Sequence, residues 1–122
     1  MASSSMKFLF DIDVDADLTA AVDLRGVFIH EIIMPAAWTA ASVVIMCAET
    51  LTGTYLPFQL YGSTDPLELK VEASVRSGNL GGLKIGDCFV KLLSVTVGAP
   101  GTPTDQLTAD RTVVVKVRQI GE

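Results

Sequence analysis

The stretch KFLFDIDVD, residues 7–15, decides the fold class of this chain. Its inward candidates recur at every second position: Phe8, Phe10, Ile12 and Val14. Successive side chains of a β-strand point to opposite faces, so a period of two predicts a half-buried strand. Aspartates fill most of the remaining positions, which fits the solvent face of a strand at the edge of a sheet, where charge opposes unwanted pairing.

Similar signals continue along the chain. Residues 67–75 and 111–117 alternate in the same way, whereas 42–48 is an almost unbroken apolar stretch, typical of a strand buried on both faces. Further apolar strands are predicted at 27–34 and 88–97, and a short edge strand, weakened by Pro57, at 55–60. Glycine and proline clusters predict turns at 23–26, 52–53, 62–66 and within 77–86, and a loop at 98–104.

These elements predict an all-β fold, a single-domain antiparallel β-sandwich, jelly-roll-like or barrel-like, with about seven to eight strands. The chain of 122 residues has the length of one domain. Because the alternation begins at Lys7, we expect a flexible N-terminal arm over residues 1–6 and one sandwich domain over residues 7–122.

Composition narrows the classes of partner. The chain has 9 Lys and Arg against 14 Asp and Glu, a net charge of −5, which argues against nucleic acid as a ligand. A hydrophobic content of 49% predicts a folded domain with apolar surface available for a partner. The uncharged stretch 32–48 is broken by Pro35 and contains β-branched residues, so strands are expected there in place of a membrane span.

Residues that could carry chemistry are few. His30 is the only histidine and no Gly-x-Ser-x-Gly elbow accompanies it, so the chain is expected not to be an enzyme and to have no catalytic residues or cofactor. No metal site is expected, because one histidine and two separated cysteines cannot supply structural zinc and the aspartates of 11–17 lack the glycine and glutamate of a calcium loop. Cys47 and Cys88 are predicted to be buried thiols, with a disulfide as the alternative.

Five residues are structural or interface candidates. Trp38, with Pro35 beside it, either plugs one end of the sandwich or anchors a subunit contact; the plug is the preferred interpretation. Phe58 and Tyr61, on the weak edge strand, are the expected exposed contact residues. Arg111, at the start of the last strand, is expected on a solvated strand end or beside an acidic neighbour.

Three segments together resemble a family of small virion proteins of tailed bacteriophages, among them head-decorating or cement proteins. They are Asp23-Leu24-Arg25-Gly26, residues 32–41 with their Pro35 and Trp38, and Gln106 with residues 109–113. The resemblance covers most of the chain from Asp23 to Val117, and the segment 32–41 is the most specific.

The resemblance implies a capsid decoration protein that stabilises the head by binding between major-capsid subunits. Its partners would be the major capsid protein and further copies of itself, as a dimer or trimer. It would be assembled in the host cytoplasm and lie on the capsid surface of the virion. The alternative is a tail, baseplate or head-fibre component that acts as a receptor-binding, glycan-binding or adaptor module.

Overall fold

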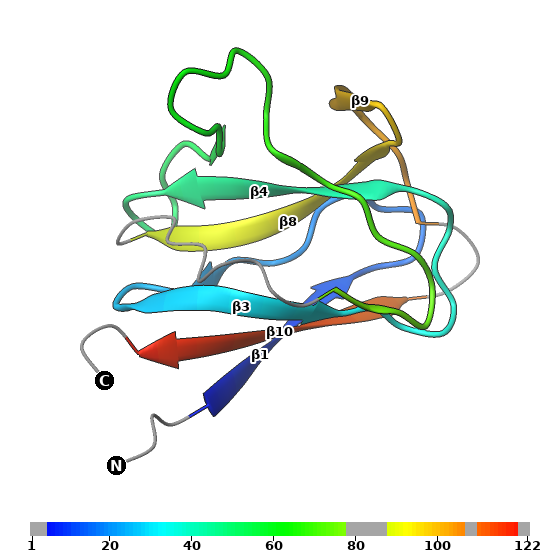
Figure 1. Ribbon diagram of the computed structural model, residues 1–122, viewed down its shortest axis with the longest axis horizontal. Helices are drawn as coiled ribbons and strands as arrows, with labels where there is room; N and C mark the ends of the chain where they lie inside the picture. Colours follow the sequence, from blue (N-terminus) through cyan, green and yellow to red (C-terminus); the bar gives the residue numbers. More distant parts are fainter. Residues whose placement is uncertain (1–4, 78–87, 107–109, 120–122) are drawn as a thin grey trace.

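The computed structural model describes residues 5–77, 88–106 and 110–119, and this part of the chain contains strands and no helix (Figure 1). The strands are β1 (Ser5–Ile12), β2 (Val22–Asp23), β3 (Val27–Ile33), β4 (Ser42–Ala48), β5 (Leu56–Pro57), β6 (Glu68–Leu69), β7 (Arg76–Ser77), β8 (Phe89–Thr96), β9 (Ala99–Pro103) and β10 (Arg111–Gln119). The all-β prediction is confirmed.

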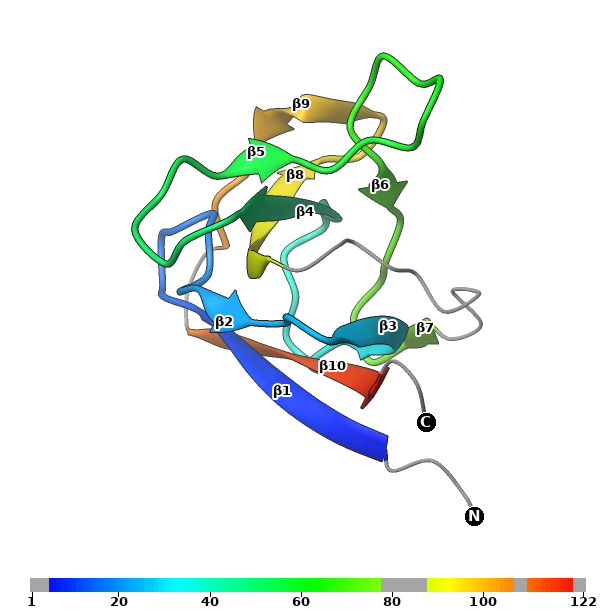
Figure 2. The ribbon, with the colours of Figure 1, turned by 90° about the vertical axis from the view of Figure 1, so that its left-hand side faces the viewer.

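The strands form two antiparallel sheets that face each other (Figure 2). One sheet has the order β1-β10-β3-β7, and the other the order β2-β8-β4-β5, with β6 on β4 and β9 on β8. Apart from β5 and β9, the strands pair as a nested hairpin: β1 with β10, β2 with β8, β3 with β7 and β4 with β6. This nesting is the jelly-roll form of the β-sandwich, so of the predicted alternatives the barrel is wrong.

The core lies between the two sheets. Alternate residues of β10 are fully buried, and Phe10 of β1 packs beside them. The opposite sheet contributes the inward residues of β4 and β8. The buried core includes Phe10, Ile29, Ile32, Val43, Ile45, Val90, Leu92, Val113, Val115 and Val117. Val44, on the other face of β4, is also fully buried, as predicted for a strand covered on both sides.

Two local interactions fix the ends of β3. Before the strand, the side chain of Asp23 accepts hydrogen bonds from Arg25, and Gly26 adopts a φ of +82°, so the chain turns as predicted. Near its end, Glu31 forms a two-bond ion pair with Arg76 of β7, at 2.8 and 2.9 Å. This ion pair joins the inner strand to the short edge strand β7.

The long strands agree with the sequence, but several local predictions are wrong. The predicted edge strand 55–60 is shortened to β5. Val14 lies beyond the end of β1 and is exposed. The predicted strand 67–75 is only β6, because the chain leaves β4 after two residue pairs and crosses to the other sheet, where β7 begins. The predicted loop 98–104 contains β9, whose prolines are tolerated because it pairs only with β8, at the margin of the sheet.

The predicted boundary of the N-terminal arm, residues 1–6, is wrong by two residues. Ser5 and Met6 belong to β1 and pair with Arg118 and Val117 of β10. The first four residues, and the glycine turns predicted within 77–86 except for Ser77 itself, lie outside the described residues. No helix in the described ranges has the length and apolar character needed to cross a membrane; the stretch 32–48 supplies parts of β3 and β4.

Replacing Ile45 with alanine tests the core. This side chain is 1% exposed, so its loss should lower the free energy of unfolding by about 2–5 kcal/mol through lost burial and a residual cavity. Urea unfolding followed by tryptophan fluorescence measures the change. The control Val97→Ala removes an exposed apolar side chain and should cost less than about 0.5 kcal/mol; equal effects would contradict the assigned core.

Candidate functional site

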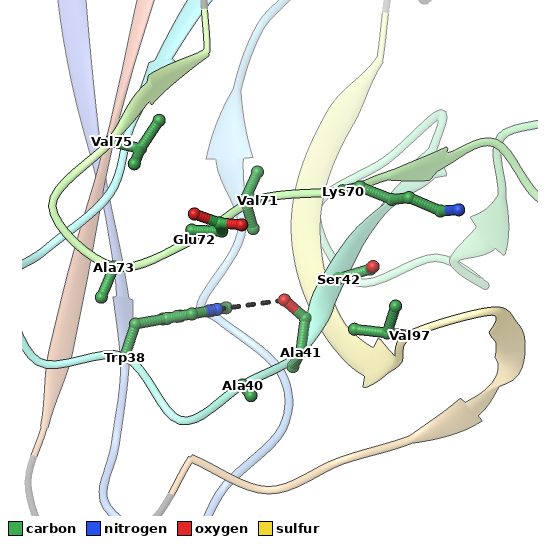
Figure 3. A pocket seen from close by; sticks show the side chains of 10 residues that line it. All are labelled: Trp38, Ala40, Ala41, Ser42, Lys70, Val71, Glu72, Ala73, Val75 and Val97. Atoms are coloured by element: carbon green, nitrogen blue, oxygen red, sulfur yellow. Dashed lines mark hydrogen bonds between the residues drawn. The ribbon is translucent and has the colours of Figure 1, made fainter.

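A cleft with a volume of about 620 Å³ lies beside Trp38. Figure 3 shows its walls: the end of the β3–β4 connection on one side and the chain crossing between the sheets on the other. Its lining residues are Trp38, Ala40, Ala41, Ser42, Lys70, Val71, Glu72, Ala73, Val75 and Val97. Small and apolar side chains dominate, so the cleft fits an apolar or ring-shaped group better than an ion.

Trp38 is half-buried and held in place by its own loop. Its indole nitrogen donates a hydrogen bond of 3.1 Å to the carbonyl of Ala41, and its ring packs against the core (Figure 3). Pro35, two residues after β3, accepts a hydrogen bond from the Ser74 N–H of the crossing chain. Both contacts fit the preferred plug interpretation of Trp38, and its role as an interface anchor stays a prediction.

Gln106 fixes the loop that carries Trp38. Its fully buried carboxamide accepts a bond of 2.8 Å from the Thr39 N–H and donates one of 3.0 Å to the Thr39 carbonyl, as a neighbouring strand would. The same nitrogen donates to the Ser94 hydroxyl on β8. The Gln106 backbone also pairs with Ala16, after the end of β1. One residue therefore joins the Trp38 loop to β8 and to the connection that follows β1.

Glu68 lies between the cleft and β9. Its carboxylate accepts hydrogen bonds from the Ser42 hydroxyl at 2.6 Å and from the Gly98 N–H at 2.9 Å. The Gly98 bond, followed by the Ser42 bond, holds the pKa of Glu68 below its ordinary value. Glu68 thus joins the cleft margin to the β8–β9 turn as an anion at neutral pH.

The cleft brings charged groups near an aromatic ring, and the Ser42 hydroxyl that lines it donates to the Glu68 carboxylate. Exposed Glu72 and Lys70 line it, and the Lys70 side chain extends away from the indole in Figure 3. His30 does not line it and lies in β3, with a ring nitrogen buried and lacking a hydrogen bond. Among the described residues no group of three or more His, Cys, Asp or Glu side chains could hold a metal ion.

A second hollow, of about 390 Å³, lies over the end of β4 and exposes part of Cys47. Both cysteines are free thiols, as predicted; Cys88 is buried, also as predicted, whereas Cys47 is only half-buried. Burial, reinforced by the adjacent Cys88, raises the pKa of Cys47 to about 12. The thiolate is the nucleophilic form of cysteine, so a raised pKa lowers the nucleophilicity of Cys47.

The connection from β4 to β6, residues 49–67, projects from the sandwich (Figure 1). Several of its apolar side chains are exposed to solvent. Tyr61 on this projecting segment is fully exposed, as predicted. The prediction for Phe58 is wrong, because this ring is half-buried and packs against the core. The exposed side chains are instead those of Leu56 and Leu60, two positions before and after Phe58.

Arg111 also differs from its prediction. Its side chain is 5% exposed, although a solvated strand end was expected. The residue has the same parity along β10 as Val113 and Val115, so it points to the interior at the end of the sandwich. Arg111 therefore belongs to the inside of the fold, and Lys116 and Arg118 supply the more accessible charge of β10.

The chain was compared with models of known protein families, with curated proteins and with solved structures, and no match was found.

The Gln106 network can be tested with Gln106→Ala. The substitution removes the partner of the buried Ser94 hydroxyl and of two half-buried Thr39 backbone groups. A buried group left unsatisfied costs about 1–3 kcal/mol, so we expect a loss of about 2 kcal/mol or more in the free energy of unfolding. Chemical unfolding measures it. The control Gln59→Ala removes an exposed carboxamide and should cost about 0.5 kcal/mol or less. A similar loss in both variants would contradict the proposed network.

Glu68→Gln tests the anion between the cleft and β9. Because the pKa of Glu68 is lowered by folding, its stabilising effect is present above the ordinary pKa of about 4.3 and is lost as the pH falls through the folded value. The variant should melt below the wild type at pH 7, and the difference should narrow in acid. Melting temperatures from pH 7 to pH 2 measure this, with exposed Glu49→Gln as the control. A difference that is independent of pH would contradict the role of the charge.

Proposed function

We propose that this protein is a structural component of a tailed-bacteriophage virion, a capsid decoration or cement protein that stabilises the head by binding between major-capsid subunits. In this proposal it has no catalytic activity and lies on the capsid surface after assembly in the host cytoplasm. The observation that carries the proposal is residues 50–64 of the projecting segment, an uncharged stretch with exposed apolar side chains on an otherwise acidic molecule.

Most of the projecting segment, residues 50–64, is free of charge. Residues 50–64 contain no Asp, Glu, Lys, Arg or His, although charged residues make up 19% of the chain. Leu51, Leu56 and Leu60 are each half or more exposed, and Tyr61 is fully exposed. Depletion of charge together with exposed aromatic and aliphatic side chains is typical of the centre of a protein–protein contact.

The same segment is held in one conformation before any partner binds. The Phe58 N–H donates to the Ile45 carbonyl of β4, and the Leu67 N–H donates to the Phe58 carbonyl. The Tyr55 hydroxyl donates to the Leu51 carbonyl at 2.8 Å. A surface that is already ordered loses little conformational entropy on binding, which favours its use as a docking element.

Three further features support a role on the capsid. The residues that resemble the phage virion family include the Asp23–Gly26 turn and the Trp38 loop, which connect strands of different sheets, and Gln106, which bonds to the Trp38 loop. Jelly rolls recur in viral capsid domains, which is an argument by analogy. Many copies on one particle also turn weak single contacts into firm attachment.

The cleft beside Trp38 favours the second candidate, a tail, baseplate or head-fibre module that binds a receptor or a glycan. The aromatic ring of Trp38 with the Glu72 carboxylate nearby offers stacking and hydrogen bonds to a sugar ring. Lectin domains also include jelly rolls. Copy number in purified virions separates the two: a shell protein is present in hundreds of copies, a tail protein in a handful.

The double variant Leu56→Ser, Tyr61→Ser tests the docking segment. Both side chains are exposed, so the melting temperature should stay unchanged while binding to purified mature heads that lack the chain falls by about tenfold or more. Co-sedimentation with heads measures binding. Val97→Ser, an exposed apolar residue outside the segment, is the control and should bind normally. Unchanged binding of the double variant would contradict this docking surface.

A further inference from the structure

The outer side of β1 is an unpaired sheet edge. In the described part of the chain, β1 pairs only with β10, and it forms the lower boundary of the molecule in Figure 1. The other sheet edges are protected: β2, β5, β6 and β7 contain two residues each, and β9 carries two prolines. Eight residues of open strand present a row of N–H and C=O groups that can pair with another chain.

The solvent-facing side chains of β1 form a short pattern of charge, apolar group and charge. Lys7, Leu9 and Asp11 alternate with the inward residues, and all three are exposed; Leu9 is 54% exposed. The strand therefore has a cation before its centre, an apolar residue at its centre and an anion after it. An antiparallel copy of this pattern is its own complement.

We propose that a second copy of this chain pairs with it through β1, antiparallel, with a twofold axis at Leu9. In this register the two Leu9 side chains lie opposite each other, and Lys7 of each copy lies opposite Asp11 of the other. Directly opposite residues in an antiparallel pair have Cβ atoms about 4.5–5.5 Å apart, so both ion pairs and the leucine contact form together. The inward residues of both copies remain on one side of the joined sheet.

Neighbouring registers that keep the core faces together are worse matches. A shift of the axis to Phe10 places Leu9 opposite Asp11, and a shift to Phe8 places Lys7 opposite Leu9. An axis at Asp11 opposes two like charges, which is destabilising. The charges of β1 thus oppose most pairings, as expected for an edge strand, and permit the self-complementary one.

The proposed dimer also continues a feature of the sheet surface. On the solvent side of the four-stranded sheet, Leu9 is opposite Val114 of β10, and Val114 is opposite Ile33 of β3. These three residues form an apolar row across the strands, and the dimer joins it to the same row of the second copy. The result is one eight-stranded sheet. An uninterrupted apolar band crosses it, and each subunit contributes half of this band.

Charge reversal tests the pairing and its register. We expect the wild-type chain to sediment as a dimer at about 100 μM, and Lys7→Glu or Asp11→Lys alone to raise the dimer dissociation constant by about tenfold or more, because each opposes like charges. An equimolar mixture of the two variants should dimerise again, since both ion pairs form between unlike copies. Lys70→Glu, on the exposed crossing chain, is the control and should dimerise as the wild type does.

Sedimentation velocity measures the mass, and circular dichroism with thermal melting verifies that each variant is folded. A wild-type chain that is monomeric at this concentration would overturn the proposal, as would a dimer that tolerates both single reversals. A mixture of the two folded variants that stays monomeric would overturn the register. This test is independent of the proposed role on the capsid, because it requires only the purified chain.

Discussion

Eight residue pairs join β1 to β10, and every other strand pair of the jelly roll is nested inside them. β10 lies between β1 and β3, and its alternate valines are fully buried beneath the second sheet. The pairing joins residues about a hundred positions apart, so it closes a long loop at an entropic cost that burial between the sheets must offset. A domain built mainly from distant pairs is expected to fold slowly compared with a helical bundle of its size.

Hydrophobic patterning located the long strands because each has one side in the core and the other in a different environment. The patterning failed where side chains alternate between covered and exposed positions but the backbone does not pair with a neighbouring strand. Residues 67–75 alternate because the crossing chain also has a covered side and an exposed side, yet only Glu68 and Leu69 pair as β6. Two-residue strands are too short to show a period, and the prolines of β9 concealed a strand that pairs with only one neighbour.

The candidate site was partly predictable. Pro35 and Trp38 were selected from the sequence; Trp38 lines the cleft, and Pro35 precedes it in the same loop. Gln106 came into view only through a family resemblance, because the role of a buried carboxamide depends on which backbone groups the fold places next to it. The burial of Phe58 and Arg111 likewise depends on strand ends and parity, which composition does not reveal. The open edge of β1 required the order of the strands.

The pairing of Ser5 with Arg118 places the entrance and the exit of the sandwich at one corner, as Figure 1 also shows. A peptide appended at either end would therefore be presented from the same pole of the domain, away from the projecting segment. Joining the two ends by a linker and opening the chain at an exposed turn would preserve the strand order, so the architecture is well suited to circular permutation or to insertion into a loop of another protein.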